Sequence, residues 1–375
     1  IYMGDWSSDV CSSDLFGLQA GCTTQPALRR SPMPFVDGLS FMPDLIRNPQ
    51  ALAESGLCSF ILDVSKAQQI PTEDGSVRYW RTFEACAQSI DAMRVRLQGM
   101  DGVFLATRGS EIRQAYRDGR IAVFFQFQGC EPLGEDLGRI DYFYERGLRV
   151  LQITHHNDNP FGGGALEPNP RGLTALGHAG VERMNELGIL PDVSHASDAT
   201  ALDVIKASKA PVILSHGAAR SIVRNARCAP DEVIRAIGDS GGVMGIFMIS
   251  FWLTQDETPT VEHLLQQIRH VENVAGSEAV GIGNDFTIAG HEPSAALGNV
   301  NSEAVKSSLP WWESVGRQGI LGYDSLPSHY VVPELNNTRR MFVIHQALER
   351  AGYTSARIER ILGGNWIREI GRAHV

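Results

Sequence analysis

The chain has 375 residues, 43% of them apolar, and its 33 basic and 43 acidic residues give a formal net charge of −10. Lys and Arg form no basic stripe and no run of about 18 apolar residues occurs, which argues against a nucleic-acid or anionic-membrane partner and predicts no transmembrane span. The six cysteines are widely spaced without a C-x-x-C pair, so neither a zinc ribbon nor a dense disulfide framework is indicated.

Residues 1–34 are predicted to be a leader outside the folded domain. Residues 1–15, like the tail 369–375, resemble translated library-adapter sequence and continue no periodic pattern beside them. The following letters FGLQAGCTTQP resemble the end of a bacterial lipoprotein signal with Cys22 as the lipidated residue, and a chance AGC triplet is the alternative interpretation. The signal interpretation predicts a protein of the bacterial cell envelope or periplasm, and the alternative predicts a cytoplasmic one.

From residue 35 onward, short apolar runs alternate with amphipathic stretches. The predicted strands are 35–41, 58–64, 102–107, 121–129, 149–155, 189–195, 211–216, 242–248 and 279–286. The predicted helices between them are 82–98, 135–147, 175–188, 198–208, 230–239 and 260–276. Because strands this uniformly apolar are covered on both faces, the pattern predicts a parallel sheet with helical crossovers. Eight or nine such units favour a single α/β domain, a (β/α)8 TIM barrel over residues 35–368.

The alternation breaks after Asp285. Residues 287–330 contain many Gly, Pro and aromatic residues, and this segment is predicted to be a long loop after the last strand that covers the mouth of the barrel. C-terminal helices are predicted over 338–352 and 355–370.

Polar side chains close six of the predicted strands, and in a barrel such strand ends face the mouth where active sites lie. These residues are Asp37, Gln128, His155, His195, His216 and Asp285. His195 and His216 are one βα unit apart, so they are predicted to face each other at metal-chelating distance. Alone, each would more simply be a structural histidine that closes a strand. His156 is predicted to point away from His155, because side chains alternate along a strand.

Taken together, these segments resemble the renal (membrane) dipeptidase family of zinc metallopeptidases. The matching stretches are YERGLRVLQITHHNDN, LGILPDVSHASDAT, PVILSHGAARSIVRNARCAPDEVI, VGIGNDF and GGNWIR, in the family's order and spacing. The resemblance covers about Phe35 to Arg368. It implies an amidohydrolase-type barrel with a two-zinc centre, a small-molecule or dipeptide substrate, and a homodimer.

The resemblance also implies roles for individual residues. His195 and His216 match the histidines of one zinc site, and His155 matches the histidine that stabilises the developing oxyanion. Arg227 matches the arginine that holds the substrate carboxylate. Asp285 matches the aspartate that handles the substrate amine or a proton.

The chain departs from the family at the ligands of the other zinc ion. The family's first strand carries His-x-Asp, where this chain has Leu39 and Phe41, and Gln128 replaces the glutamate that bridges both ions. Leucine and phenylalanine cannot ligate a metal, and a neutral amide offers less charge than a carboxylate. We therefore expect one Zn2+ instead of two, held by His195, His216 and weakly by Gln128.

Two alternatives to a one-zinc dipeptidase-like hydrolase follow from the lost ligands. An inactive protein of the same fold, holding no metal, could bind a small zwitterionic metabolite through Arg227 and Asp285. A related barrel enzyme could instead catalyse different chemistry, because barrels change reaction when their strand-end residues change. The sequence leaves the substrate, the metal content and the oligomeric state open.

Overall fold

The computed structural model describes residues 30–42, 49–71 and 77–373. The predictions for residues 1–29, Cys22 included, lie outside the described residues. The four cysteines within the described ranges are buried and free, as expected for small apolar residues. None of the described helices is long and apolar enough to span a bilayer.

The larger sheet is parallel and largely buried. Its strands are β1 (Phe35–Phe41), β2 (Leu57–Asp63), β5 (Val103–Leu105), β6 (Ile121–Phe127), β7 (Leu148–Gln152), β8 (Leu190–Asp192) and β12 (Phe286–Thr287). They follow the order β12-β1-β2-β6-β7-β8, and β5 pairs with β6 off this path. The uniformly apolar runs thus form a parallel sheet, as their pattern predicts.

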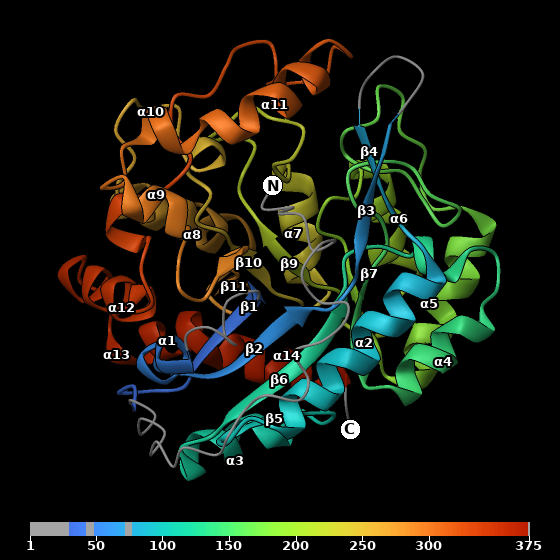
Figure 1. Cartoon of the computed structure of the whole chain (residues 1–375), viewed down its shortest axis with the longest axis horizontal. Helices are drawn as coiled ribbons and strands as arrows, with labels where there is room; N and C mark the ends of the chain where they lie inside the picture. Colours follow the sequence, from blue (N-terminus) through green and yellow to red (C-terminus); the bar gives the residue numbers. More distant parts are fainter. Residues whose placement is uncertain (1–29, 43–48, 72–76, 374–375) are drawn as a thin grey trace, which may run out of the picture.

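A second parallel sheet contains β9 (Leu214–Gly217), β10 (Met244–Ile246) and β11 (Val280–Ile282). A parallel bridge between Asp192 and Ile213 connects the end of β8 to the residue before β9. The backbone N–H of Asp285 donates to the carbonyl oxygen of Leu39 in β1 at 3.0 Å. The molecule is therefore an α/β fold with a curled parallel sheet, and its strands lie at the centre of Figure 1 with helices around them.

The predicted crossover helices are present. They are α2 (Phe83–Gln98), α4 (Gly138–Glu145), α5 (Ala175–Leu187), α6 (Asp198–Ala207), α7 (Asp231–Asp239) and α8 (Val261–Ala275). Side chains of Thr82, Thr174 and Ser197 cap α2, α5 and α6 by accepting a backbone N–H of the first turn. The structure adds elements that were not predicted: α1 (Pro49–Glu54), α3 (Ser110–Asp118) and the antiparallel hairpin β3 (Ala67–Pro71) and β4 (Val77–Arg81).

The segment after the last strand was predicted to be a long loop. It instead contains three short helices, α9 (Glu292–Ala296), α10 (Asn301–Ala304) and α11 (Leu309–Gly316). A proline in the first turn starts α9 and α11, where its missing N–H costs nothing. The Trp312 indole is buried and donates to the carbonyl oxygen of Ser325 at 2.8 Å. The many loop-forming residues concealed these short helices.

Three helices follow toward the C-terminus, and the last of them packs against β1 and β11. They are α12 (Arg340–Arg350), α13 (Ser355–Glu359) and α14 (Asn365–Ala373). Trp366 in α14 is fully buried and donates from its indole to the carbonyl oxygen of Ile282 at 2.9 Å. A Cβ at Gly38 of β1 would lie 2.3 Å from its ring and one at Gly281 of β11 2.5 Å, so only glycine leaves room for the indole. The predicted boundary at residue 369 falls inside α14.

Trp366 gives a direct test of this packing. Replacing it by alanine should lower the free energy of unfolding by about 3–5 kcal/mol, because a large cavity replaces the indole. Urea unfolding measures the change, and Val95→Ala, at a 69% exposed apolar position, is the control with an effect within about 0.5 kcal/mol. A loss of less than about 1 kcal/mol for Trp366→Ala would mean that this packing contributes little.

Candidate functional site

Four buried histidines gather where three neighbouring strands end. His155 and His156 follow β7, His195 follows β8, and His216 lies in β9. We call these four residues the histidine cluster.

His195 is the centre of the histidine cluster. Its backbone has φ of 62°, a left-handed conformation that a non-glycine residue adopts only under constraint. Its Nε2 lies 2.8 Å from Nε2 of His216, and its Nδ1 lies 3.2 Å from Nδ1 of His156. The ring of His155 stacks on that of His195, with 4.3 Å between centroids. Each nitrogen of His195 thus faces a different histidine.

The prediction that His156 points away from His155 is wrong. It assumed that the strand continues to residue 155, but β7 ends at Gln152 and the next residues form bends. Side-chain alternation therefore stops before the two histidines. Their ring centroids are 4.0 Å apart, and both belong to the cluster.

The Arg227 guanidinium lies against the histidine cluster. Its Nη2 is 3.0 Å from Nε2 of His195 and donates to the carbonyl oxygen of His216 at 3.2 Å. Arg227 is buried beside the rings of Phe247 and Trp252, and burial lowers its pKa. Within the described part of the chain its Nε has no hydrogen-bond partner, and no carboxylate forms an ion pair with it within 4.0 Å. A buried cation without a paired anion is costly to a fold.

Asp285 follows β11 with φ of 55°. Burial raises the pKa of its carboxyl group to about 6, and the positive charge of Arg227 opposes that rise. Gln128 follows β6 and directs its amide nitrogen to Oδ2 of Asp63 at 3.2 Å, so the structure ties its NH2 group to a carboxylate.

Further buried polar residues lie near the strand ends and were given no role from the sequence. Asp63 ends β2, and burial raises the pKa of its carboxyl group against the charge of Arg81. Burial likewise raises the pKa of Glu131, and the positive charge of Arg81 opposes that rise as well. Asp63 gives the same signal as the other strand-end residues, since it closes a predicted apolar strand. Arg81 gave no such signal, because its hairpin was not predicted.

A carboxylate, a hydroxyl and an imidazole line up behind His216. Ser215 Oγ donates to Oδ2 of Asp192 at 2.5 Å and lies 2.8 Å from Nδ1 of His216. Because the hydroxyl has one proton and gives it to Asp192, Nδ1 of His216 must be the donor in the second contact. Nε2 of His216 therefore carries a lone pair that faces His195.

The histidine cluster fits a metal ion. Burial holds the pKa of all four imidazoles well below the ordinary value, so they are neutral, which is the form that ligates metals. Ligand atoms of His155, His156 and His195 lie within 4.8 Å of one another.

Two residues of β1 that bear on the predicted site are also buried. Leu39 is fully buried, and Asp37 accepts hydrogen bonds from Ser40 and Asn284.

Comparison with known proteins gives a family match. The family described as membrane dipeptidase (peptidase family M19) matches residues 50–303. The chain is 34% identical over 212 residues to "Dipeptidase verJ" of Clonostachys rogersoniana, a match covering 55% of this chain and 54% of that protein. It is 29% identical over 281 residues to "Dipeptidase 3" of Rattus norvegicus, covering 69% of this chain and 57% of that protein. The chain therefore spans just over half the length of these curated relatives.

Solved structures share the fold. An amidohydrolase from Pseudomonas aeruginosa aligns with a TM-score of 0.75 and 23% identity, covering 91% of this chain and 97% of that one. A metallo peptidase from Rhodobacter sphaeroides, liganded with a phosphinate mimic of the dipeptide L-Ala-D-Ala, aligns with a TM-score of 0.70 and 19% identity, covering 91% and 99%. At these identities the likeness concerns the fold alone.

The unpaired charge of Arg227 predicts a stability effect. Arg227→Met should raise the free energy of unfolding by about 1 kcal/mol or more, because an apolar side chain of similar volume replaces a buried cation that has no ion-pair partner within 4.0 Å. Arg224→Met, at an exposed position three residues earlier, is the matched control and should change it by less than about 0.5 kcal/mol. Destabilisation by Arg227→Met in urea unfolding would instead show that the hydrogen bonds of the guanidinium stabilise the fold.

Proposed function

Because the chain belongs to the membrane dipeptidase family, peptidase family M19, we propose that it is a metal-dependent hydrolase that cleaves a small amide such as a dipeptide. One observation carries the proposal: a cluster of neutral, buried histidines lies in contact with a buried guanidinium that has no carboxylate partner within the described residues. The histidines suit a metal ion, and the guanidinium suits the carboxylate of a substrate.

We further infer that the two sheets form one closed (β/α)8 barrel. Backbone hydrogen bonds support this closure: Val193 N donates to Ile213 O at 2.9 Å and Ile213 N to Pro191 O at 3.0 Å, between β8 and β9. Trp366 adds support, because its ring lies close to Gly38 of β1 and to Gly281 of β11, which belong to different sheets. Closure brings the ends of parallel strands to one mouth.

One zinc ion, instead of two, accounts for the residues present. The apolar Leu39 and Phe41 offer no ligand on β1, and the ion's ligands come from the histidine cluster. His195 belongs to both ligand sets that the geometry allows. One set, expected from the sequence, joins it to His216 and weakly to Gln128, and the other joins it to His155 and His156. An ion bound there would supply a Lewis acid for the scissile carbonyl and lower the pKa of water.

The other residues have roles that follow from their surroundings. Arg227 binds the substrate carboxylate, a charge-assisted pairing that relieves its buried positive charge. Asp285, with a pKa of about 6, is ionised at neutral pH yet close enough to it to accept and return a proton. His155, where it does not ligate the ion, polarises the substrate carbonyl by hydrogen bonding.

A second candidate is an inactive protein that binds a small zwitterion. The full burial of the apolar Leu39 in β1 favours it, since Leu39 and Phe41 offer no metal ligand. Arg227 and Asp285 would then hold the ligand's carboxylate and amine.

The homodimer and the cell-envelope location are proposals drawn from the family resemblance and from the letters around Cys22.

The hydrolase proposal is tested on the purified chain. We expect about one zinc ion per chain by elemental analysis and release of amino acids from members of a dipeptide panel. His195→Ala should abolish both, whereas His178→Ala, at an exposed histidine of α5, should change neither. A zinc-free chain with no hydrolysis, but with thermal stabilisation by a dipeptide, would favour the inactive binding protein.

Asp285 predicts a pH dependence. Its deprotonated form accepts the proton, so kcat/KM should be constant above a pKa of about 6 and should fall about tenfold per unit below it. Asp285→Asn should lose about 100-fold or more of kcat and flatten this acid limb. A limb that persists in Asp285→Asn would assign the titration to another group.

A further inference from the structure

We propose that His156 is a positioning residue of the metal site. Its Nδ1 accepts a hydrogen bond from the Nδ1–H of His195, which directs Nε2 of His195, together with Nε2 of His216, to the ion. This inference rests on the proposed function, because it concerns the ligands of that metal site. Of the two ligand sets that the geometry allows, it supports the one that contains both His195 and His216.

The neighbours of His195 determine which of its ring nitrogens carries the proton. A metal ligand is a neutral imidazole, which has one N–H and one ring nitrogen with a lone pair. Nη2 of Arg227 lies 3.0 Å from Nε2 of His195, and a guanidinium nitrogen can only donate. A second hydrogen bond, to the carbonyl oxygen of His216 at 3.2 Å, holds this Nη2 in place. Nε2 of His195 is therefore the acceptor, and its proton lies on Nδ1.

The Nδ1–H of His195 faces His156. The two Nδ1 atoms are 3.2 Å apart, within the range of a hydrogen bond. Because His195 donates, Nδ1 of His156 accepts, and the proton of neutral His156 lies on Nε2. His155 cannot take this role, because its ring stacks on the face of His195 at 25° between planes, whereas an imidazole N–H points outward in the plane of its own ring. The ring of His156 is turned by 71° from that of His195.

His216 has an outer partner of the same kind. Its Nδ1 donates to Oγ of Ser215, which donates to Asp192, so its lone pair lies on Nε2. The Nε2 atoms of His195 and His216 are 2.8 Å apart, and both carry lone pairs, an arrangement that is unfavourable unless a cation attracts them. A ligating histidine commonly donates its other N–H to an acceptor that fixes its ring. Ser215 serves His216 in this way, and His156 serves His195.

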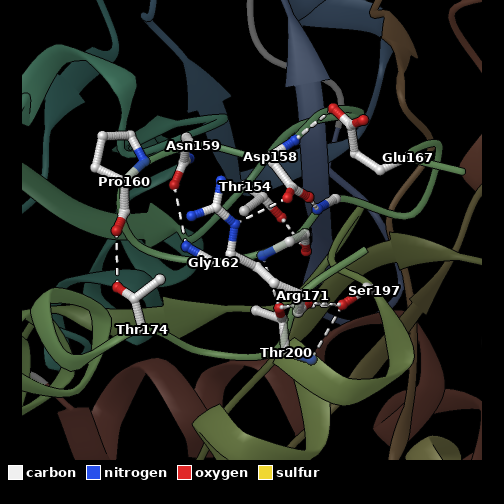
Figure 2. A network of polar contacts seen from close by, with 12 residues as sticks. Thr154, Asp158, Asn159, Pro160, Gly162, Glu167, Arg171, Thr174, Ser197 and Thr200 are labelled. Atoms are coloured by element: carbon white, nitrogen blue, oxygen red, sulfur yellow. Dashed lines mark hydrogen bonds and ion pairs between the residues drawn. The ribbon is translucent and has the colours of Figure 1, made fainter. Parts of the chain in front are cut away.

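The loop after β7 holds His156 in position through its backbone. Leu166 N donates to the carbonyl oxygen of His156 at 2.9 Å. Figure 2 shows the neighbouring part of this loop, where the backbone N–H of Asp158 donates to Glu167 at 2.9 Å. The ring of Trp311 lies 5.3 Å from that of His156, measured between centroids. The acceptor is therefore placed by contacts that do not involve His195, as a preorganised site requires.

Two substitutions separate an acceptor role of His156 from a packing role. Asparagine offers an oxygen acceptor near the position of Nδ1 but has no ring, whereas phenylalanine keeps a ring beside Trp311 but accepts nothing. We expect His156→Phe to weaken Zn2+ binding, measured by calorimetry, by about 10–100-fold, and His156→Asn to stay within about threefold of the unmutated chain. His178→Phe, at an exposed histidine of α5, is the control and should leave the affinity unchanged. Circular dichroism checks the fold of each variant.

The tautomer of His195 is measured without metal. Long-range nitrogen–proton NMR correlations of the zinc-free chain, labelled at its histidine rings, report which ring nitrogen carries the proton. The signals of His195 are those that disappear in His195→Asn. We expect the Nδ1–H form in the unmutated chain and in His156→Asn, and a shift toward the Nε2–H form in His156→Phe.

Two results overturn this inference and leave the proposed metal-dependent hydrolase standing. One is a Zn2+ affinity of His156→Asn that is equal to or weaker than that of His156→Phe. The other is an Nε2–H form of His195 in the unmutated chain. An unmutated chain that binds no Zn2+ overturns the inference and the proposed function together.

Discussion

The ring of His195, held between other histidines, is the contact on which the chemistry of this protein depends. Its left-handed backbone directs one nitrogen to His216 and the other to His156. His195 follows β8 and His216 lies in β9, whereas His155 and His156 lie in the loop after β7. Strain at a non-glycine residue is retained only where the surrounding structure enforces it, and such residues concentrate at functional sites.

The charges of the buried groups determine which kind of ligand the site favours. The imidazoles are neutral because they are buried, and Arg227 adds a buried positive charge that no described carboxylate pairs with at contact distance. Asp285 opposes this charge from a distance, with a pKa raised to about 6. A site of this kind is stabilised by an anionic ligand, which is why a substrate carboxylate fits the proposed function better than a neutral or cationic compound.

Much of the fold could be predicted because buried parallel strands are apolar along their whole length, as in β2, β6 and β7. The helices that cover them have strong amphipathic patterns and capping residues such as Thr174. The segment 287–330 could not be predicted, because its short helices take their stability from tertiary contacts such as those of Trp312.

At the site, strand ends indicated His155, His195, His216 and Asp285, since each closes an apolar run. The role of His156 depended on β7 ending three residues before His155, and strand boundaries are the weakest part of pattern analysis. The partner of Gln128, Asp63, comes from another strand and could be recognised only once the strands were placed side by side.

The central claim is that a single metal ion binds inside the histidine cluster. The most direct measurement is anomalous X-ray diffraction at the zinc absorption edge from crystals of the Zn2+-loaded chain. The account predicts one anomalous peak inside the histidine cluster, beside the ring of His195. No peak in the cluster, or two peaks with one beside Leu39 and Phe41, would contradict it.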